Sequence, residues 1–385
     1  MMYLKPNSPT MSYSRRIWLK QASFTLAALG IGEAVTAAPN TLNNSLNGVP
    51  ALPAGKVILL NSNENAYGPA ASVQKAMSRA VSLSNRYPDE EVPAFKKKLS
   101  AFWKTNPENM MLGAGSSEIL GIVSLWLANQ KGNVIIAEPS YRVWNNQAEQ
   151  YGLSFIRVPL TADKKLDLEK MLAAITPETR MVYICNPNNP TGTYLDHAKL
   201  QAFVVECSKK CFVLVDEAYT EFAELPTLAP EAAANQNILV AKTFSKIYGL
   251  AGARAGYAIA HPDTIKKLTA LQAWPDVAVS QVTAAGASAA LDDQEFVKFC
   301  RDKAAESRQL VFDTCKEMKL EYIPSSTSFV LFNIDSLKCD ISEAMQKKNI
   351  MVQYRNHFGG KWCRVSMGTT EEMKIFCSSL KQICG

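Results

Sequence analysis

Short apolar runs that alternate with longer helical segments are the feature that most constrains the fold of this 385-residue chain. The apolar runs are bounded by Gly, Pro, Asn or Asp, as is typical of strands buried on both faces of a sheet. They span Val134–Ala137, Met181–Cys185, Phe212–Val215, Ile238–Ala241 and Tyr257–Ala260. The segments predicted as helices are Ser117–Ala128, Tyr141–Tyr151, Leu166–Ile175 and Asp196–Lys209. This alternation predicts an α/β fold with a mostly parallel sheet, which binds its ligands at the carboxyl ends of the strands.

The pattern changes after His261, where long helical segments precede short strands. Helices are predicted over Ser280–Leu291 and Asp292–Met318, and strands near Ser328–Asn333 and Arg364–Met367. We therefore expect a large domain over residues 56–275 and a smaller α/β domain over residues 276–385. The segment near residues 56–70 is expected to contact the small domain or a partner subunit.

The first 38 residues have the pattern of a targeting segment. Arg15 and Arg16 precede a weakly apolar run over residues 22–32, and small residues follow at a predicted cleavage site near Ala38. This order resembles a twin-arginine export signal and predicts a periplasmic or exported protein. The alternative is an amphipathic N-terminal helix of a cytoplasmic protein. The apolar run is too short for a stable membrane span, and residues 39–55 are predicted to be a linker.

Composition and charge exclude several classes of protein. The net charge is +6, and half of it falls within the first forty residues. The remaining basic residues are scattered along the chain, which argues against a nucleic-acid partner. The nine cysteines include no Cys-x-x-Cys pair, and the chain has three histidines, so neither a metal cluster nor a disulfide framework is expected. We expect most of the cysteines to act as small core residues.

Polar side chains follow three successive apolar runs, at the point where each predicted strand ends. Asn189 follows the strand that ends at Cys185, and Asp216 and Tyr219 follow the next one. Lys246 follows the third. A carboxylate at the end of an apolar strand needs a partner, because burying it unpaired costs free energy. We therefore expect these side chains to meet at one edge of the sheet.

Lys246 is the candidate nucleophile. A nearby cation lowers the pKa of a lysine, and Arg254 lies eight positions further along the chain. Thr243 and Ser245 supply hydroxyl donors beside it. Taken alone, the stretch is equally compatible with an ordinary loop that carries two solvated cations.

The combined set fits the requirements of pyridoxal phosphate. This cofactor needs a lysine, an acidic partner for its pyridine nitrogen, donors for its phenolate oxygen and a cradle for its phosphate. Asp216 would pair with the ring nitrogen, while Asn189 and Tyr219 would contact the phenolate oxygen. A glycine-rich turn, in isolation an ordinary turn, directly precedes a predicted helix, whose N-terminus can bind an anion. The predicted phosphate site consists of Ser116, Ser117, Thr243, Ser245 and Arg254.

These motifs resemble the fold-type I pyridoxal phosphate aminotransferases, and within them the histidinol-phosphate aminotransferase branch of class I and II. The resemblance runs from about Leu60 to the C-terminus and includes the segments 60–69, 86–89 and 363–369. It implies a large and a small domain, covalent attachment of the cofactor to Lys246, and amino-group transfer between an amino donor and a 2-oxo acid. It also implies a homodimer with shared active sites.

The resemblance implies roles for further residues. Tyr141 would pack on the cofactor, with a core tyrosine as the alternative. Tyr87 would reach the cofactor phosphate of the neighbouring subunit, and Tyr67 the partner's substrate. Arg364 would grip a substrate carboxylate or phosphate, and Arg355 would be a second anion contact unless it is a solvated surface arginine.

The chain departs from the family pattern at Ser117, where many relatives carry aspartate, at Ala66, where proline is usual, and over residues 355–363. Because the last segment borders the substrate, histidinol phosphate remains one candidate among several amino donors. A decarboxylase of the threonine-phosphate type and a non-catalytic amino-acid-binding protein are the alternatives.

Overall fold

The computed structural model describes residues 57–275 and 279–384. The predicted signal over residues 1–38 and the linker over residues 39–55 lie outside the described residues. Within the described ranges, no helix has both the length and the apolar character needed to cross a membrane.

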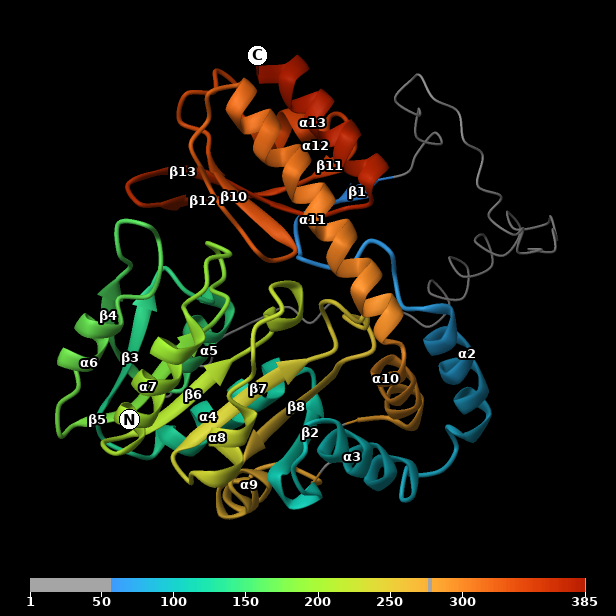
Figure 1. Cartoon of the computed structure of the whole chain (residues 1–385), viewed down its shortest axis with the longest axis vertical. Coiled ribbons are helices and arrows are strands. Elements are labelled where there is room, and N and C mark those ends of the chain that lie inside the picture. The colour runs from blue at the N-terminus through green and yellow to red at the C-terminus, as the bar shows by residue number, and fades with distance from the viewer. Residues whose placement is uncertain (1–56, 276–278, 385) are drawn as a thin grey trace, which may run out of the picture. The chain divides into compact units, whose positions relative to one another are not determined.

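A seven-stranded sheet forms the centre of the larger half of the described chain (Figure 1). Its strands, in spatial order, are β2 (Met110–Ala114), β8 (Ala255–Ala260), β7 (Ile238–Thr243), β6 (Phe212–Asp216), β5 (Thr179–Cys185), β3 (Asn133–Glu138) and β4 (Ser154–Pro159). All neighbours run parallel except β8, which is antiparallel to both β2 and β7. The mostly parallel sheet is thus confirmed. The reversal at β8 follows from its link to β7, which is a loop without the crossover helix that a parallel connection uses.

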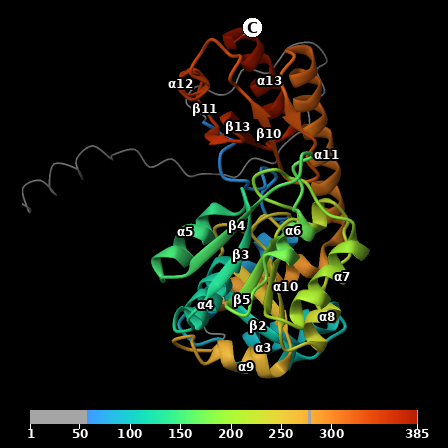
Figure 2. The same ribbon diagram turned by 90° about the vertical axis from the view of Figure 1, so that its left-hand side faces the viewer.

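Helices cover both faces of this sheet (Figures 1 and 2). On one face lie α4 (Ser116–Ala128), α5 (Arg142–Gln150) and α9 (Pro262–Thr269). On the other lie α6 (Leu168–Ala173), α7 (His197–Ser208) and α8 (Ala229–Ala234). Along β5, Tyr183 belongs to the first core and its neighbours Val182 and Ile184 to the second. The continuous apolar runs in the sequence reflect this burial on both faces.

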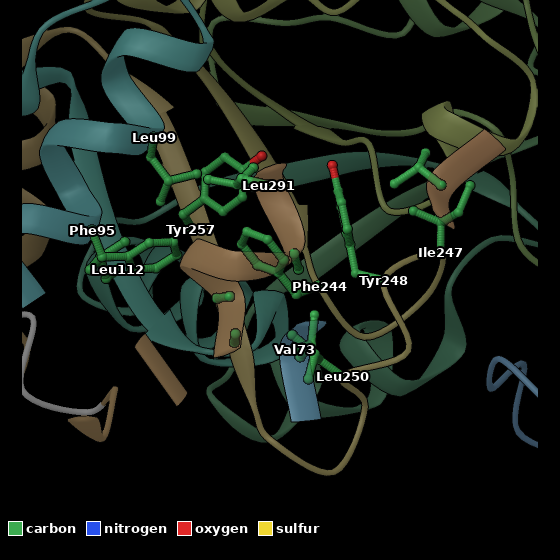
Figure 3. Close-up of a cluster of buried hydrophobic side chains, with 14 of the residues drawn as sticks. Val73, Phe95, Leu99, Leu112, Phe244, Ile247, Tyr248, Leu250, Tyr257 and Leu291 are labelled. Atoms are coloured by element: carbon green, nitrogen blue, oxygen red, sulfur yellow. The ribbon is translucent and has the colours of Figure 1, made fainter. Parts of the chain in front are cut away.

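A third core fixes the loop that follows β7. It lies against α2 (Ala71–Ala80), α3 (Glu91–Phe102) and α10 (Gln281–Asp292), and Figure 3 shows part of it. Phe244 is fully buried there, and its ring centroid lies 4.8 Å from that of Tyr248. Because apolar side chains on both sides of Lys246 are anchored in this core, the lysine sits on a fixed loop.

A four-stranded antiparallel sheet follows in the C-terminal part of the chain. Its order is β12 (Gln353–His357), β13 (Gly360–Ser366), β10 (Phe329–Asn333) and β9 (Tyr322–Ile323). The long helix α11 (Gln294–Glu317), with α12 (Ile341–Gln346) and α13 (Thr370–Cys384), completes this part. The short strand β1 (Ile58–Leu59) pairs in parallel with β11 (Ile350–Met351). Helix α10 follows the predicted domain boundary but packs on α2 and α3.

Short 3₁₀ turns at η1 (Val81–Leu83), η2 (Pro107–Asn109) and η3 (Thr220–Phe222) connect these elements. Strands β2, β4 and β12 had no prediction. The sequences of β4 and β12 are interrupted by polar residues, whereas β2 is a short apolar run that the sequence reading did not single out. The cysteines Cys185, Cys207, Cys211, Cys300, Cys315, Cys363 and Cys377 are buried free thiols, and Cys339 is disulfide-bonded.

Candidate active site

A cavity of about 400 Å³ opens where β5, β6 and β7 end, and residues of the smaller sheet complete its wall. Eight of the residues singled out in the sequence line it: Ser116, Tyr141, Asn189, Asp216, Tyr219, Lys246, Arg355 and Arg364. Three strand ends that are far apart in the sequence therefore meet in one site, together with two arginines from β12 and β13.

The amine of Lys246 is held in a site that disfavours its charge. Its pKa is lowered to about 8, first by burial and then by the positive charge of Arg364. Arg254, the cation expected to have this effect, makes the smallest contribution. The amine lies 5.8 Å from the centre of the Tyr219 ring. The alternative of a loop with a solvated lysine does not describe this environment.

Asp216 is buried at the end of β6 with two hydrogen-bond donors. The hydroxyl of Tyr183 donates to Oδ2 over 3.0 Å, and the backbone amide of Ala218 donates to Oδ1 over 3.2 Å. Burial raises the pKa of Asp216 to about 6, while these two donors oppose the rise. The carboxylate is therefore mostly ionised at neutral pH and has a fixed orientation. Sequence reasoning missed Tyr183, which looked like an ordinary apolar-strand residue.

Hydrogen bonds from Asn63 and Arg364 position the side chains of Tyr219 and Asn189. The Asn63 amide donates to the Tyr219 hydroxyl over 3.0 Å, and Arg364 Nη1 donates to Asn189 Oδ1 over 2.8 Å. Arg364 Nη2 donates to the carbonyl of Asn61, while Nε is buried without a partner. Asn63 has a φ of 53°. Sequence reasoning did not single it out, although it lies in segment 60–69, and the family resemblance of that segment could have identified it.

The turn before α4 and Arg254 form a second, separate cluster beside the cavity. Arg254 donates to the carbonyl of Ala114 over 3.1 Å and approaches the Ser245 hydroxyl at 3.5 Å. The Thr243 hydroxyl donates to Ser245 over 2.9 Å. A Cβ on Gly256 would lie 2.3 Å from the backbone of Gly115, so glycine is required for this approach.

This cluster has the chemistry of an anion site. The first turn of α4 begins at Ser116 and has no side-chain cap, so its backbone N–H groups are available. Ser117, the next residue, is exposed at the same helix start. With the Arg254 guanidinium alongside, the site can bind a phosphate through backbone donors and one full positive charge.

Buried charges tie the loop after β6 to β7. The Lys242 amine donates to Glu217 over 3.0 Å and to the Thr220 hydroxyl over 2.9 Å, and lies 3.0 Å from Glu221. It also lies 4.8 Å from the centre of the Trp103 ring. These contacts hold the segment that carries Asp216 and Tyr219 against the strand that leads to Lys246.

Tyr67 and Tyr87 do not line this cavity. Tyr87 is 64% exposed, and its ring centroid lies 4.8 Å from that of Trp274. The Tyr67 hydroxyl lies 3.4 Å from that of Thr370. The roles expected for both residues require a second copy of the chain and stay predictions.

The residues present fit pyridoxal phosphate. Lys246 and Asp216 face one cavity, and the helix start with Arg254 provides an anion site next to it. Within the described ranges, no group of His, Cys, Asp and Glu is arranged to hold a metal ion. A doubly wound sheet with this site at its carboxyl edge defines a fold-type I pyridoxal-phosphate-dependent enzyme.

Comparisons with known proteins identify the family. The profile of the aminotransferase class I and II family matches residues 55–380, and the chain belongs to this family. It is 35% identical to the histidinol-phosphate aminotransferase of Bacillus cytotoxicus over 82% of this chain and 86% of that protein. The corresponding enzyme of Brevibacillus brevis is also 35% identical, over 85% of this chain and 90% of that protein.

A solved structure extends the comparison. The histidinol-phosphate aminotransferase of Sinorhizobium meliloti in complex with pyridoxal-5′-phosphate has a TM-score of 0.78 and 28% identity, over 85% of this chain and 90% of that one. The chain is a pyridoxal-phosphate-dependent aminotransferase.

The depressed pKa of Lys246 predicts a pH-dependent stability in the cofactor-free protein. An unfolded lysine has a pKa of about 10.4, so between pH 8 and that value the unfolded state binds the extra proton and stability rises with pH. At pH 7 the buried ammonium is a net cost. We expect Lys246→Met to raise the free energy of unfolding there by up to about 3 kcal/mol, since some solvent contact at the cavity screens the effect.

Urea unfolding of both cofactor-free proteins at pH 7, 8.5 and 10 checks this expectation. The difference between variant and wild type should shrink as the pH rises. Lys199→Met, which removes an exposed amine from α7, should show no such trend. Equal stability of wild type and Lys246→Met at pH 7 would contradict the prediction.

Proposed function

We propose that this enzyme transfers the amino group of a donor with a phosphate or an aromatic ring, such as histidinol phosphate, to a 2-oxo acid. The observation that carries the proposal is the placement of Arg364 and Arg355 in the same cavity as Lys246 and Asp216. The names of the relatives support the choice of donor. An anionic substrate would bind to the arginines with its amino group toward Lys246.

Each residue has a proposed task. Arg364 binds a substrate anion through its guanidinium, whose Nε lacks a partner in the described structure. Lys246 Nζ takes a proton from the substrate carbon that bears the amino group and later returns one. The Asp216 carboxylate would hold the ring nitrogen of the cofactor and stabilise its proton. When bound, pyridoxal phosphate supplies an electron-withdrawing ring that stabilises negative charge on that carbon.

Tyr219, Asn189 and Tyr141 complete the proposed cofactor site. Tyr219 and Asn189 keep their hydrogen-bonding atoms fixed through Asn63 and Arg364. The pKa of the Tyr141 hydroxyl is raised, mainly by burial and then by the charge of Asp216, so it stays protonated and can donate a hydrogen bond. Ser116, Ser117, Thr243, Ser245 and Arg254 are the proposed phosphate ligands.

A donor screen on the purified holoenzyme tests the proposal. We expect histidinol phosphate or an aromatic amino acid to convert the bound cofactor to its amine form, with a 2-oxo acid restoring the starting spectrum. In Lys246→Ala the absorbance of covalently attached cofactor should be lost. Its transfer rate should fall by about 10²- to 10⁴-fold or more, because the proton-transfer group is gone.

The control for the screen is Lys199→Met, which should retain wild-type activity. Release of carbon dioxide without formation of the amine form of the cofactor would contradict amino transfer and favour a decarboxylase. Wild-type activity in Lys246→Ala would remove the lysine from the mechanism.

We also propose a homodimer with shared active sites. Tyr87 and Trp274 form an aromatic pair that is 64% and 51% exposed, and such surfaces mark protein interfaces. In a dimer, Tyr87 and Tyr67 would reach the partner's site. Sedimentation of the holoenzyme should give twice the chain mass, and Trp274→Ser should weaken the association. A monomeric, fully active holoenzyme would contradict the dimer.

Export through the twin-arginine pathway is a further proposal. It rests on the sequence around Arg15 and Arg16, and the disulfide at Cys339 is compatible with an oxidising compartment. In a host with this pathway, the chain should appear in the periplasmic fraction. Replacing both arginines by lysine should keep it in the cytoplasm. An unchanged location would contradict the export signal.

A further inference from the structure

Two arginines in the cavity have no partner within the described chain. Arg142, the first residue of α5, comes from the helices around the large sheet, and Arg355 comes from β12 of the smaller sheet. Among the described residues, neither guanidinium takes part in a hydrogen bond or an ion pair. Asp216 is the sole carboxylate among the described lining residues, and Tyr183 and Ala218 already hold it. The substrate side of the cavity therefore carries uncompensated positive charge.

The register of the smaller sheet explains which side chains face the cavity. Arg355 pairs with Trp362, and His357 pairs with Gly360, across β12 and β13. Since alternate residues of a strand share a face, Arg355 and His357 lie on the cavity side together with Trp362. Asn356, which lies between them, is exposed and does not line the cavity.

The surroundings of His357 show that the positive charges converge. Its pKa is lowered to about 4, first by burial and then by the charges of Arg355, Arg364 and Arg142. The imidazole is therefore neutral at pH 7 and offers hydrogen-bonding atoms without a charge of its own. Trp362 Nε1 is also buried without a partner.

We propose that Arg142 and His357 are specificity-determining residues that, with Arg355, bind a doubly charged terminal group of the amino donor. The inference rests on the proposed function and identifies the part of the site that binds the terminal group of the amino donor. Arg364 can bind one carboxylate on its own. A phosphate monoester brings up to two negative charges and three acceptor oxygens, which matches two guanidiniums and a neutral imidazole.

The test compares two donors that differ in this group alone, histidinol phosphate and histidinol, on the holoenzyme. Arg142→Met should lower kcat/KM for histidinol phosphate by about 10- to 100-fold, mainly through KM, because a charged hydrogen bond is lost. The value for histidinol should change less than twofold. Arg142→Lys should recover part of the loss, and Lys199→Met, an equal change of charge outside the cavity, should have no effect.

His357 is tested in the same way. His357→Gln keeps a neutral hydrogen-bonding group and should retain most of the preference for the phosphorylated donor, whereas His357→Leu should reduce it. Equal losses for both donors in the Arg142 variants would overturn the proposal, because they would indicate a structural role.

A binding measurement separates this inference from the proposed function. Inorganic phosphate should bind the wild-type holoenzyme, whose cofactor site is filled, and Arg142→Met should weaken that binding by at least tenfold in calorimetry. If neither donor reacts but phosphate binding still depends on Arg142, the anion site stands and the proposed function fails. If both donors react and Arg142→Met leaves phosphate binding unchanged, the anion site is wrong.

Discussion

Burial of the Lys246 amine is the constraint on which the rest of the structure depends. A lysine that takes and returns protons near neutral pH must be moved away from water, and a buried ammonium is costly. The fold meets this need by placing Lys246 on a loop whose apolar neighbours Phe244 and Tyr248 are anchored in a core. The positive charge of Arg364, on the smaller sheet, is the second-largest cause of the lowered pKa of Lys246. The proposed catalytic group and the proposed substrate-binding group are therefore electrostatically coupled.

The meeting of the proposed cofactor-binding side chains in one cavity was largely predictable from the sequence. Asp216 ends a doubly buried strand, and Asn189, Tyr219 and Lys246 each lie a few residues after one. Parallel strands bring such residues to one edge. This reasoning needs neither register nor side-chain contacts. The same reasoning could not identify residues whose role depends on side-chain contacts in the folded chain. Tyr183, which holds Asp216, lies within a strand whose sequence is otherwise apolar.

The substrate half was less predictable because it depends on antiparallel register. Arg355 and Arg364 were found by resemblance, but nothing in the sequence indicated that His357 would share their face. The pairing of β12 with β13 determines this, and β12 itself had no strand prediction. Arg142 begins a helix of the other half of the chain, so only the tertiary fold brings it into the cavity that Arg355 also lines. The sequence also could not show that Arg364 lowers the pKa of Lys246 more than Arg254 does, because this depends on their distances in the folded chain.

The buried cluster around Lys242 limits how this active site can change. Its one ammonium lies between Glu217 and Glu221, so replacing Lys242 alone would leave two carboxylates without their cation. Effects of substitutions within such a network do not add. The segment from Asp216 to Tyr219 is thus difficult to change one residue at a time, and redesign for new donors has more freedom in the smaller sheet and at the start of α5. Cofactor chemistry and substrate choice can then diverge at different rates.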